Sequence, residues 1–106
     1  MTGKRFFVSE VARRDIAAAR DFYRSEAGVA VAGRFLAAVE TALRKIAEFP
    51  GHGSARYAHD ARETQLRFVR ISGYPYLAFY RDRDDVLEVW RVLHAQRDIP
   101  DSLCEP

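Results

Sequence analysis

Three short apolar runs in the second half of the chain predict adjacent antiparallel strands. They cover residues 66–71, 76–81 and 86–94 and are rich in Val, Ile, Leu, Phe, Tyr and Trp. These residue types favour strands, and turn-forming residues at 72–75 and 82–85 separate the runs. This pattern is typical of a meander, and we expect it to form the sheet of a small domain.

The first part of the chain changes from a short strand pattern to a helical one. Residues 5–8 predict a brief opening strand, and Ser9 is suited to cap the helix that follows. Apolar residues then recur at helical spacing, at Ala12, Ile16, Ala19 and Tyr23. We expect this amphipathic helix to end near Gly28.

A second and stronger helical pattern follows Gly28. Its apolar residues repeat in steps of four and three, at Phe35, Val39, Ala42, Ile46 and Phe49. Pro50 and Gly51 end this pattern, and the polar residues from there to position 64 predict a loop. Two helices joined by a few residues predict an antiparallel hairpin.

The order strand, helix, helix and then three strands indicates the α+β class. We expect a small antiparallel sheet that includes the N-terminal strand, with the two-helix antiparallel hairpin packed on one face. Phe35, Val39 and Ile46 are expected to be buried against the strands. With 106 residues, the chain is expected to form a single domain, residues 1–106, around one core.

The strand at 86–94 carries apolar residues on both faces. Strict alternation places them in two sets: Leu87, Val89 and Leu93 on one face, and Val86, Trp90 and Val92 on the other. The helices can cover only one face. The other face is therefore predicted to expose an apolar patch rimmed by Arg, which would mark a partner site. The alternative is that Trp90 is an ordinary core residue.

Composition narrows the classes of function. No stretch has the length and character of a membrane span or a signal peptide, so we expect a cytoplasmic protein with no membrane partner. A lone Cys104 and the lack of Cys/His spacing argue against a disulfide, a metal site or a cofactor. The net charge of +2 is modest. Fifteen of the seventeen basic residues are Arg, which suits phosphate or carboxylate contacts, although an Arg-biased genome explains it equally.

Several short motifs follow one another along the chain in an order and spacing typical of one superfamily. They are Asp15-Ile16, Phe35-Leu36, Phe49-Pro50, Leu66-Arg67, Tyr80-Arg81 and Val92-Leu93-His94 with Arg97-Asp98. On these residues the chain resembles the RelE/ParE toxins of bacterial type II toxin–antitoxin systems, and the ParE branch most closely. Pro75 is a departure, because many members begin the third strand with Tyr-Arg and Pro removes a backbone donor there.

The resemblance implies two alternative activities. A ParE-like toxin binds and inhibits DNA gyrase without catalysis, and a cognate antitoxin with an initially disordered segment neutralises it in a toxin–antitoxin hetero-oligomer. A RelE-like toxin is a metal-independent endoribonuclease that cuts messenger RNA on the ribosome. A third alternative is an inactive member that only binds its antitoxin. We expect the ParE-like activity, because the strands offer few proton-transfer groups.

Candidate site residues lie on the predicted strands. For a nuclease, His94 would transfer protons while Arg67 and Arg81 would stabilise the phosphorane charge. For target or partner binding, the candidates are Arg67, Arg81, Trp90, Arg91, His94 and Arg97. In the structural alternative, the His94 ring packs on the sheet and bonds a backbone carbonyl or Asp98. Arg67 would then pair with a carboxylate across the sheet, and Arg97-Asp98 would form a clasp.

Overall fold

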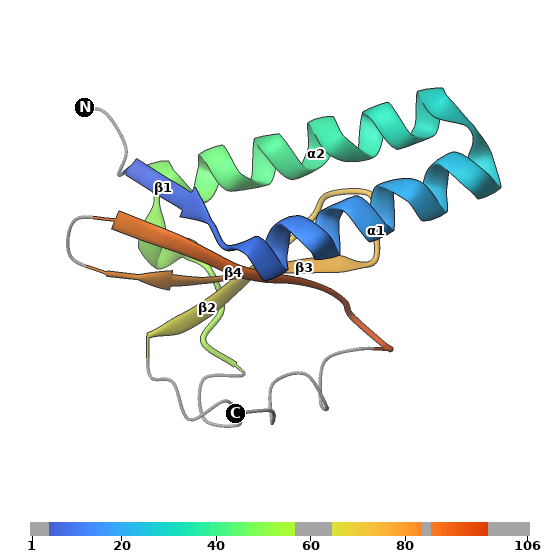
Figure 1. Cartoon of the computed structure of the whole chain (residues 1–106). Helices are drawn as coiled ribbons and strands as arrows, with labels where there is room; N and C mark the ends of the chain where they lie inside the picture. Colours follow the sequence, from blue (N-terminus) through green and yellow to red (C-terminus); the bar gives the residue numbers. More distant parts are fainter. Residues whose placement is uncertain (1–4, 57–64, 84–85, 98–106) are drawn as a thin grey trace.

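The computed structural model describes residues 5–56, 65–83 and 86–97. In chain order, the elements are β1 (Arg5–Val8), α1 (Glu10–Ala27), α2 (Val29–Glu48), a 3-10 turn η1 (Pro50–His52), β2 (Leu66–Arg70), β3 (Tyr76–Asp82) and β4 (Val86–His94). This order confirms the α+β class. The two long helices run antiparallel across one face of the sheet (Figure 1).

The sheet has four strands in the order β1-β4-β3-β2. β2, β3 and β4 form the expected antiparallel meander. β1 joins the sheet as expected, but it pairs with β4 in parallel, with Arg5 opposite Val86 and Val8 opposite Val89. The sheet is therefore mixed and not wholly antiparallel. The helical hairpin and two strands separate β1 from β4 along the chain, so no tight turn imposes an antiparallel pairing.

Ser9 starts α1 and ties it to the sheet. Its hydroxyl oxygen accepts a hydrogen bond from the backbone N–H of Ala12 (3.0 Å), as expected of an N-cap. The same hydroxyl donates to the backbone carbonyl oxygen of Trp90 (2.8 Å). At the other end, Gly28 alone connects α1 to α2 with a φ of +95°. A positive φ favours glycine, which explains why the helical pattern breaks there.

The main core lies between the helical hairpin and the sheet. Phe35, Val39 and Ile46 are 0%, 4% and 1% exposed, which confirms their predicted burial. The ring of Phe35 contacts those of Tyr23 and Tyr76, with centroid separations of 5.1 and 5.6 Å. Aromatic pairs at such separations add stability beyond the area they bury. These rings therefore anchor both helices to β3.

A β-bulge interrupts the pairing of β3 with β4. Phe79 lies opposite Arg91 and Tyr80 lies opposite Val89, so Trp90 is an extra residue on β4. The Ser9 hydroxyl binds the Trp90 carbonyl oxygen at this position. The cap of α1 and the bulge of β4 are thus joined by one side chain.

The bulge changes which side chains of β4 face the helices. Leu87 and Val89 lie in the main core as expected, but Val92 joins them there. Leu93 lies with Trp90 on the opposite face. Strict alternation predicted Leu93 on the same face as Leu87 and Val89, and Val92 on the same face as Trp90, and that prediction is wrong. An extra residue shifts a period of two by one position, so every side chain after it changes face.

The sheet face away from the helices is not the exposed apolar patch that the sequence predicted. Four of its side chains form a second cluster and are each 6% exposed or less: Leu66, Leu77, Phe79 and Leu93. Phe68, Trp90 and Ala95 are partly buried and pack against them. Among the described residues, the exposed large apolar side chains are Phe6, Phe7, Val11, Phe22, Val29, Leu36 and Phe49.

Candidate functional site

The hydroxyl of Tyr80 holds the loop that follows α2 against β3. It donates to the carbonyl oxygen of Pro50 (2.6 Å) and accepts from the backbone N–H of Gly53 (3.0 Å). Burial raises the pKa of Tyr80 above its ordinary value, although the Gly53 N–H and the nearby Arg67 oppose this. Arg67 itself donates to the Gly53 carbonyl oxygen (2.8 Å). Arg67 therefore holds the loop, and the described residues show no carboxylate paired with it.

Arg81 forms a partly buried unit with two residues of β4. Its Nη1 atom donates to Oε1 of Glu88 (3.2 Å), and each of the two side chains is 19% exposed. Its guanidinium carbon lies 4.6 Å from the centre of the Trp90 ring. A cation over the face of a Trp ring is attracted by the ring's quadrupole. Arg81 and Trp90, both proposed for binding, are therefore neighbours.

Arg91 is engaged in a contact between α1 and β4. Its Nε and Nη2 atoms donate to the two carboxylate oxygens of Asp15, at 2.9 and 3.1 Å. Oδ2 of Asp15 also accepts from the backbone N–H of Val92 (2.9 Å). The Arg91 and Asp15 side chains are only 20% and 15% exposed. This bidentate pair positions α1 on the strand, which limits what the guanidinium can offer to a partner.

His94 and Arg97 lie together where β4 ends. Nδ1 of His94 accepts from the backbone N–H groups of Gln96 (3.2 Å) and Arg97 (3.3 Å). The imidazole packs edge-on against the Tyr76 ring, with centroids 5.3 Å apart. His94 thus packs on the sheet and bonds backbone N–H groups, whereas Asp98 lies outside the described residues. Arg97 is exposed and donates to the Tyr76 hydroxyl at 3.4 Å.

The three residues named for a nuclease do not converge. His94 lies opposite Tyr76 at the start of β3, whereas Arg81 lies near its end. Because strand residues rise by about 3.3 Å each, the backbones of His94 and Arg81 are separated by about 17 Å along the strand. Arg67 lies on β2 opposite Tyr80. Acid–base catalysis needs groups within hydrogen-bond reach of one reacting bond, and the strand register does not place the backbones of His94 and Arg81 together in that way.

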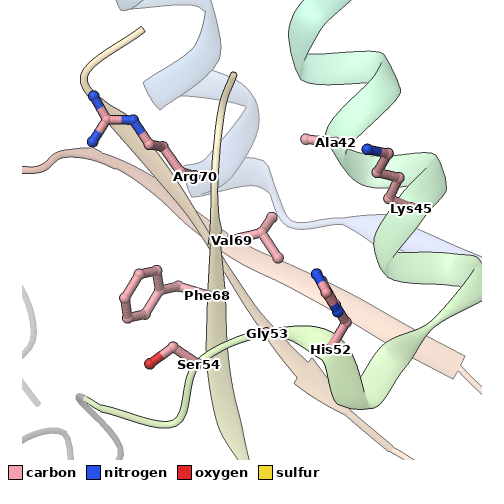
Figure 2. A pocket seen from close by; sticks show the side chains of 8 residues that line it. All are labelled: Ala42, Lys45, His52, Gly53, Ser54, Phe68, Val69 and Arg70. Atoms are coloured by element: carbon pink, nitrogen blue, oxygen red, sulfur yellow. The ribbon is translucent and has the colours of Figure 1, made fainter. Parts of the chain in front are cut away.

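A basic hollow lies between the end of α2 and β2 (Figure 2). It has a volume of about 300 Å³ and is lined by Ala42, Lys45, His52, Gly53, Ser54, Phe68, Val69 and Arg70. Its three basic residues come from three different elements, α2, η1 and β2. Sequence analysis did not find this site, because no motif links Lys45, His52 and Arg70. Only the fold brings them to one place.

A second hollow lies between α1 and the end of β4. Its volume is about 260 Å³, and it is lined by Asp15, Ala18, Ala19, Phe22, Tyr76, Val92 and Arg97. The Phe22 ring at its side is 51% exposed. An exposed aromatic ring beside an exposed Arg is a suitable contact for an amphipathic partner segment.

No group of three or more His, Cys, Asp or Glu side chains within residues 5–56, 65–83 and 86–97 is arranged to hold a metal ion. Across those same ranges, neither helix has the length and apolar character needed to cross a membrane.

Comparison with known proteins identifies the family. The sequence model described as "ParE toxin of type II toxin-antitoxin system, parDE" matches residues 6–99. No curated protein matched the sequence. Among solved structures, a chain from the chromosomal ParDE toxin–antitoxin system of P. aeruginosa is similar, with a TM-score of 0.75 and 15% identity over 88% of this chain and 97% of that one. This structural likeness shows the fold. Because the family model spans nearly the whole sequence, the chain belongs to the ParE toxin family of type II toxin–antitoxin systems.

Proposed function

We propose that this ParE-family toxin binds and inhibits DNA gyrase without catalysing a reaction, and that a cognate antitoxin neutralises it in the cytoplasm. The family match over residues 6–99 carries the proposal. The separation of His94 from Arg81 along β3 supports a binding function over a nuclease. The RelE-like nuclease is the alternative that the experiments below are designed to exclude.

The proposed contacts to gyrase lie beside the middle of β4 and at its end. Arg81 and Trp90 form one group, and His94 and Arg97 form the other. Arg97 is the most suitable for a direct contact, because it is exposed and the one hydrogen bond of its guanidinium in the described part of the chain is a long one to a tyrosine hydroxyl. Arg67 and Arg91 take part in the site by holding its framework.

The proposed antitoxin surface comprises the β1 edge and the outer side of the helical hairpin. β1 is an edge strand, and its Phe6 and Phe7 side chains are 40% and 54% exposed. Phe22 on α1 adds a third exposed ring. An edge strand can accept an extended segment through main-chain hydrogen bonds, while aromatic side chains provide apolar contact area. A segment that is disordered when free suits such an extended surface.

The decisive experiment compares gyrase inhibition with messenger cleavage by the same purified protein. We expect the wild type to inhibit supercoiling or to trap cleaved DNA, and to leave ribosome-bound messenger intact. The variant His94→Gln removes proton transfer but keeps a polar side chain, so it should retain gyrase inhibition. Cutting of messenger on the ribosome that is abolished by His94→Gln in a folded protein would overturn the proposal in favour of the nuclease.

A charge-reversal pair tests the binding surface. Arg97→Glu should weaken gyrase inhibition at least tenfold, because a reversed charge at an interface repels a partner that the native charge attracts. The control is Arg14→Glu on α1, where the native side chain is 74% exposed and forms a surface pair with Glu10. Equal inhibition by both variants would exclude Arg97 from the contact.

The antitoxin is tested by co-expression with the product of the neighbouring small gene. We expect a stable complex that no longer inhibits gyrase and that melts at a higher temperature than the toxin alone, because a ligand that binds only the folded state stabilises it. Phe7→Ser on the β1 edge should weaken this complex. A toxin that purifies alone, is harmless to cells and binds no product of that gene would contradict the proposal.

A further inference from the structure

The basic hollow between α2 and β2 is lined by three basic side chains and, among the described residues, by no carboxylate. Its eight lining residues include Lys45, His52 and Arg70 but no carboxylate. All three side chains are exposed, and in the described part of the chain the structure shows no ion pair for any of them. The charges of Lys45 and Arg70 make the potential in the hollow positive, which favours a bound anion.

The arrangement of the cations indicates a ligand with anionic groups at more than one point. In Figure 2, Lys45 and His52 lie with Val69 on one side of β2, whereas Arg70 extends on the other side with Phe68. This follows from the alternation of side chains along a strand. A ligand in the hollow can therefore contact Lys45 and His52 on one side of the strand and Arg70 on the other.

The wall that carries His52 is firmly built. Gly53, the next residue, is bound through its N–H to Tyr80 and through its carbonyl oxygen to Arg67. Ser54 then exchanges two backbone hydrogen bonds with Phe68 of β2, both at 2.9 Å. The position of the His52 backbone is thus fixed before any ligand arrives, which lowers the entropy that binding must overcome.

The position of one cation also has a simple structural explanation. Lys45 lies in the last turn of α2, where a positive charge interacts favourably with the helix dipole. That explanation does not extend to His52 in η1 or to Arg70 at the end of β2. The presence of all three around one hollow is therefore not explained by the helix dipole alone.

We propose that the basic hollow binds the phosphate of a nucleotide, either free or as part of a single-stranded nucleic acid. A terminal phosphate offers more acceptor oxygens and more charge than a carboxylate, and the non-bridging oxygens of a phosphodiester are likewise two acceptors, so one group can contact both Lys45 and His52. A second phosphate of the same ligand reaches Arg70. Val69 and Phe68 supply apolar surface for the base, since a volume of about 300 Å³ lies within the range of small-ligand sites.

This assignment goes beyond gyrase inhibition and does not depend on it, because it concerns the toxin alone. The test uses the purified full-length protein at low salt, with ADP and an eight-residue oligothymidylate as separate probes. Binding is measured by calorimetry for ADP and by fluorescence anisotropy for a labelled oligonucleotide. Binding of ADP identifies a free nucleotide as the source, whereas binding of the oligonucleotide alone identifies a nucleic acid strand.

Three variants and one control locate the site. Lys45→Gln, His52→Gln and Arg70→Gln should each weaken binding by about tenfold, because each removes one charge-assisted hydrogen bond. Arg34→Gln removes the same charge from an exposed position about three turns earlier on α2, and it should change binding less than twofold. All four positions are exposed, and circular dichroism confirms that each variant is folded.

Three outcomes would overturn the assignment. One is the absence of binding by both probes, and the second is an equal loss in Arg34→Gln and Lys45→Gln. The third is a hexaglutamate peptide that binds as tightly as the phosphate probes and depends on the same residues, which would identify the ligand as an acidic peptide. Gyrase inhibition measured on the same samples separates the two proposals, because wild-type inhibition without phosphate binding contradicts this one alone.

Discussion

Replacing Tyr80 with Phe should destabilise the protein by removing one oxygen atom from a buried network. The Tyr80 side chain is 0% exposed, and its hydroxyl joins β3 to the loop after α2. It donates to the Pro50 carbonyl oxygen (2.6 Å) and accepts from the Gly53 N–H (3.0 Å). In Tyr80→Phe the ring stays in the core, but both backbone groups lose their partner.

The expected loss follows from the two groups left without a hydrogen bond. A buried donor or acceptor that loses its partner costs about 1–3 kcal/mol. Two such groups give an upper value of about 6 kcal/mol, but burying a phenyl ring in place of a phenol avoids the desolvation of the hydroxyl. The neighbouring basic hollow also lets water approach the loop. We therefore expect Tyr80→Phe to lower the free energy of unfolding by about 2–3 kcal/mol.

Urea unfolding followed by circular dichroism measures this change, with Tyr74→Phe as the control. Tyr74 packs against Phe35 at a centroid separation of 5.2 Å, and no hydrogen bond of its hydroxyl is shown in the described residues. That control should lose less than about 0.5 kcal/mol. Surface substitutions usually change the free energy of unfolding by no more than about 0.5 kcal/mol. If the losses in Tyr80→Phe and Tyr74→Phe differ by less than about that amount, the Tyr80 hydroxyl does not stabilise the loop.

A second substitution tests the same network from the loop side. A Cβ atom added at Gly53 would clash with the Tyr80 hydroxyl and would lie 2.8 Å from the backbone carbonyl oxygen of Phe68. Gly53→Ala should therefore destabilise the protein by at least about 2 kcal/mol. Because the Phe68 oxygen belongs to the backbone, the double variant with Tyr80→Phe should remain destabilised. Full rescue in the double variant would show that only the hydroxyl restricts this position.

Three further predictions concern stability. Phe35→Ala should lower the free energy of unfolding by about 3–5 kcal/mol, and a loss below about 1 kcal/mol in urea would show that Phe35 is not a core residue. Asp15→Ala should lower the free energy of unfolding by about 2–4 kcal/mol, because it removes the three hydrogen bonds that Asp15 accepts from Arg91 and Val92. Asp15→Asn should cost less, because its side-chain oxygen can still accept from the Val92 N–H. Equal losses in the two variants would contradict this. Burial raises the pKa of both Tyr80 and Tyr23, which favours their neutral forms in the folded state. The free energy of unfolding should therefore fall as the pH rises above about 10, and it should fall less steeply in Tyr80→Phe. Urea unfolding at a series of pH values from about 9 to 11 measures this dependence. Equal slopes of the free energy of unfolding against pH in the two proteins would refute the prediction.

Local sequence signals were sufficient to predict the helical hairpin and its core. Phe35, Val39 and Ile46 follow a period that only a helix buried on one side produces, and all three are buried. Ser9 and Gly28 have side-chain and backbone properties that suit the ends of helices, and both occupy such ends. These predictions hold because each depends on residues close together in the sequence.

The face assignment after Trp90 and the basic hollow depend on contacts between distant residues. At the bulge the Trp90 carbonyl oxygen meets the Ser9 hydroxyl and the register with β3 shifts, and the sequence of β4 alone contains no sign of it. Lys45 and Arg70 are far apart along the chain and have no shared pattern. Sequence analysis therefore assigned other cations of the strands to the site and did not connect Arg70 of β2 with Lys45 of α2.

The bulge at Trp90 has a consequence for comparing this toxin with its relatives. In a relative without the extra residue, each position of β4 after the bulge would face the opposite side of the sheet. Its apolar and polar residues there would have to exchange places for the same face to stay in the core. An alignment without a gap would then match Val92 to a residue of the opposite face and count a conserved core position as a substitution. A one-residue gap at Trp90 restores the match, so the register of this strand should be set from structure before any residue near its end is judged variable.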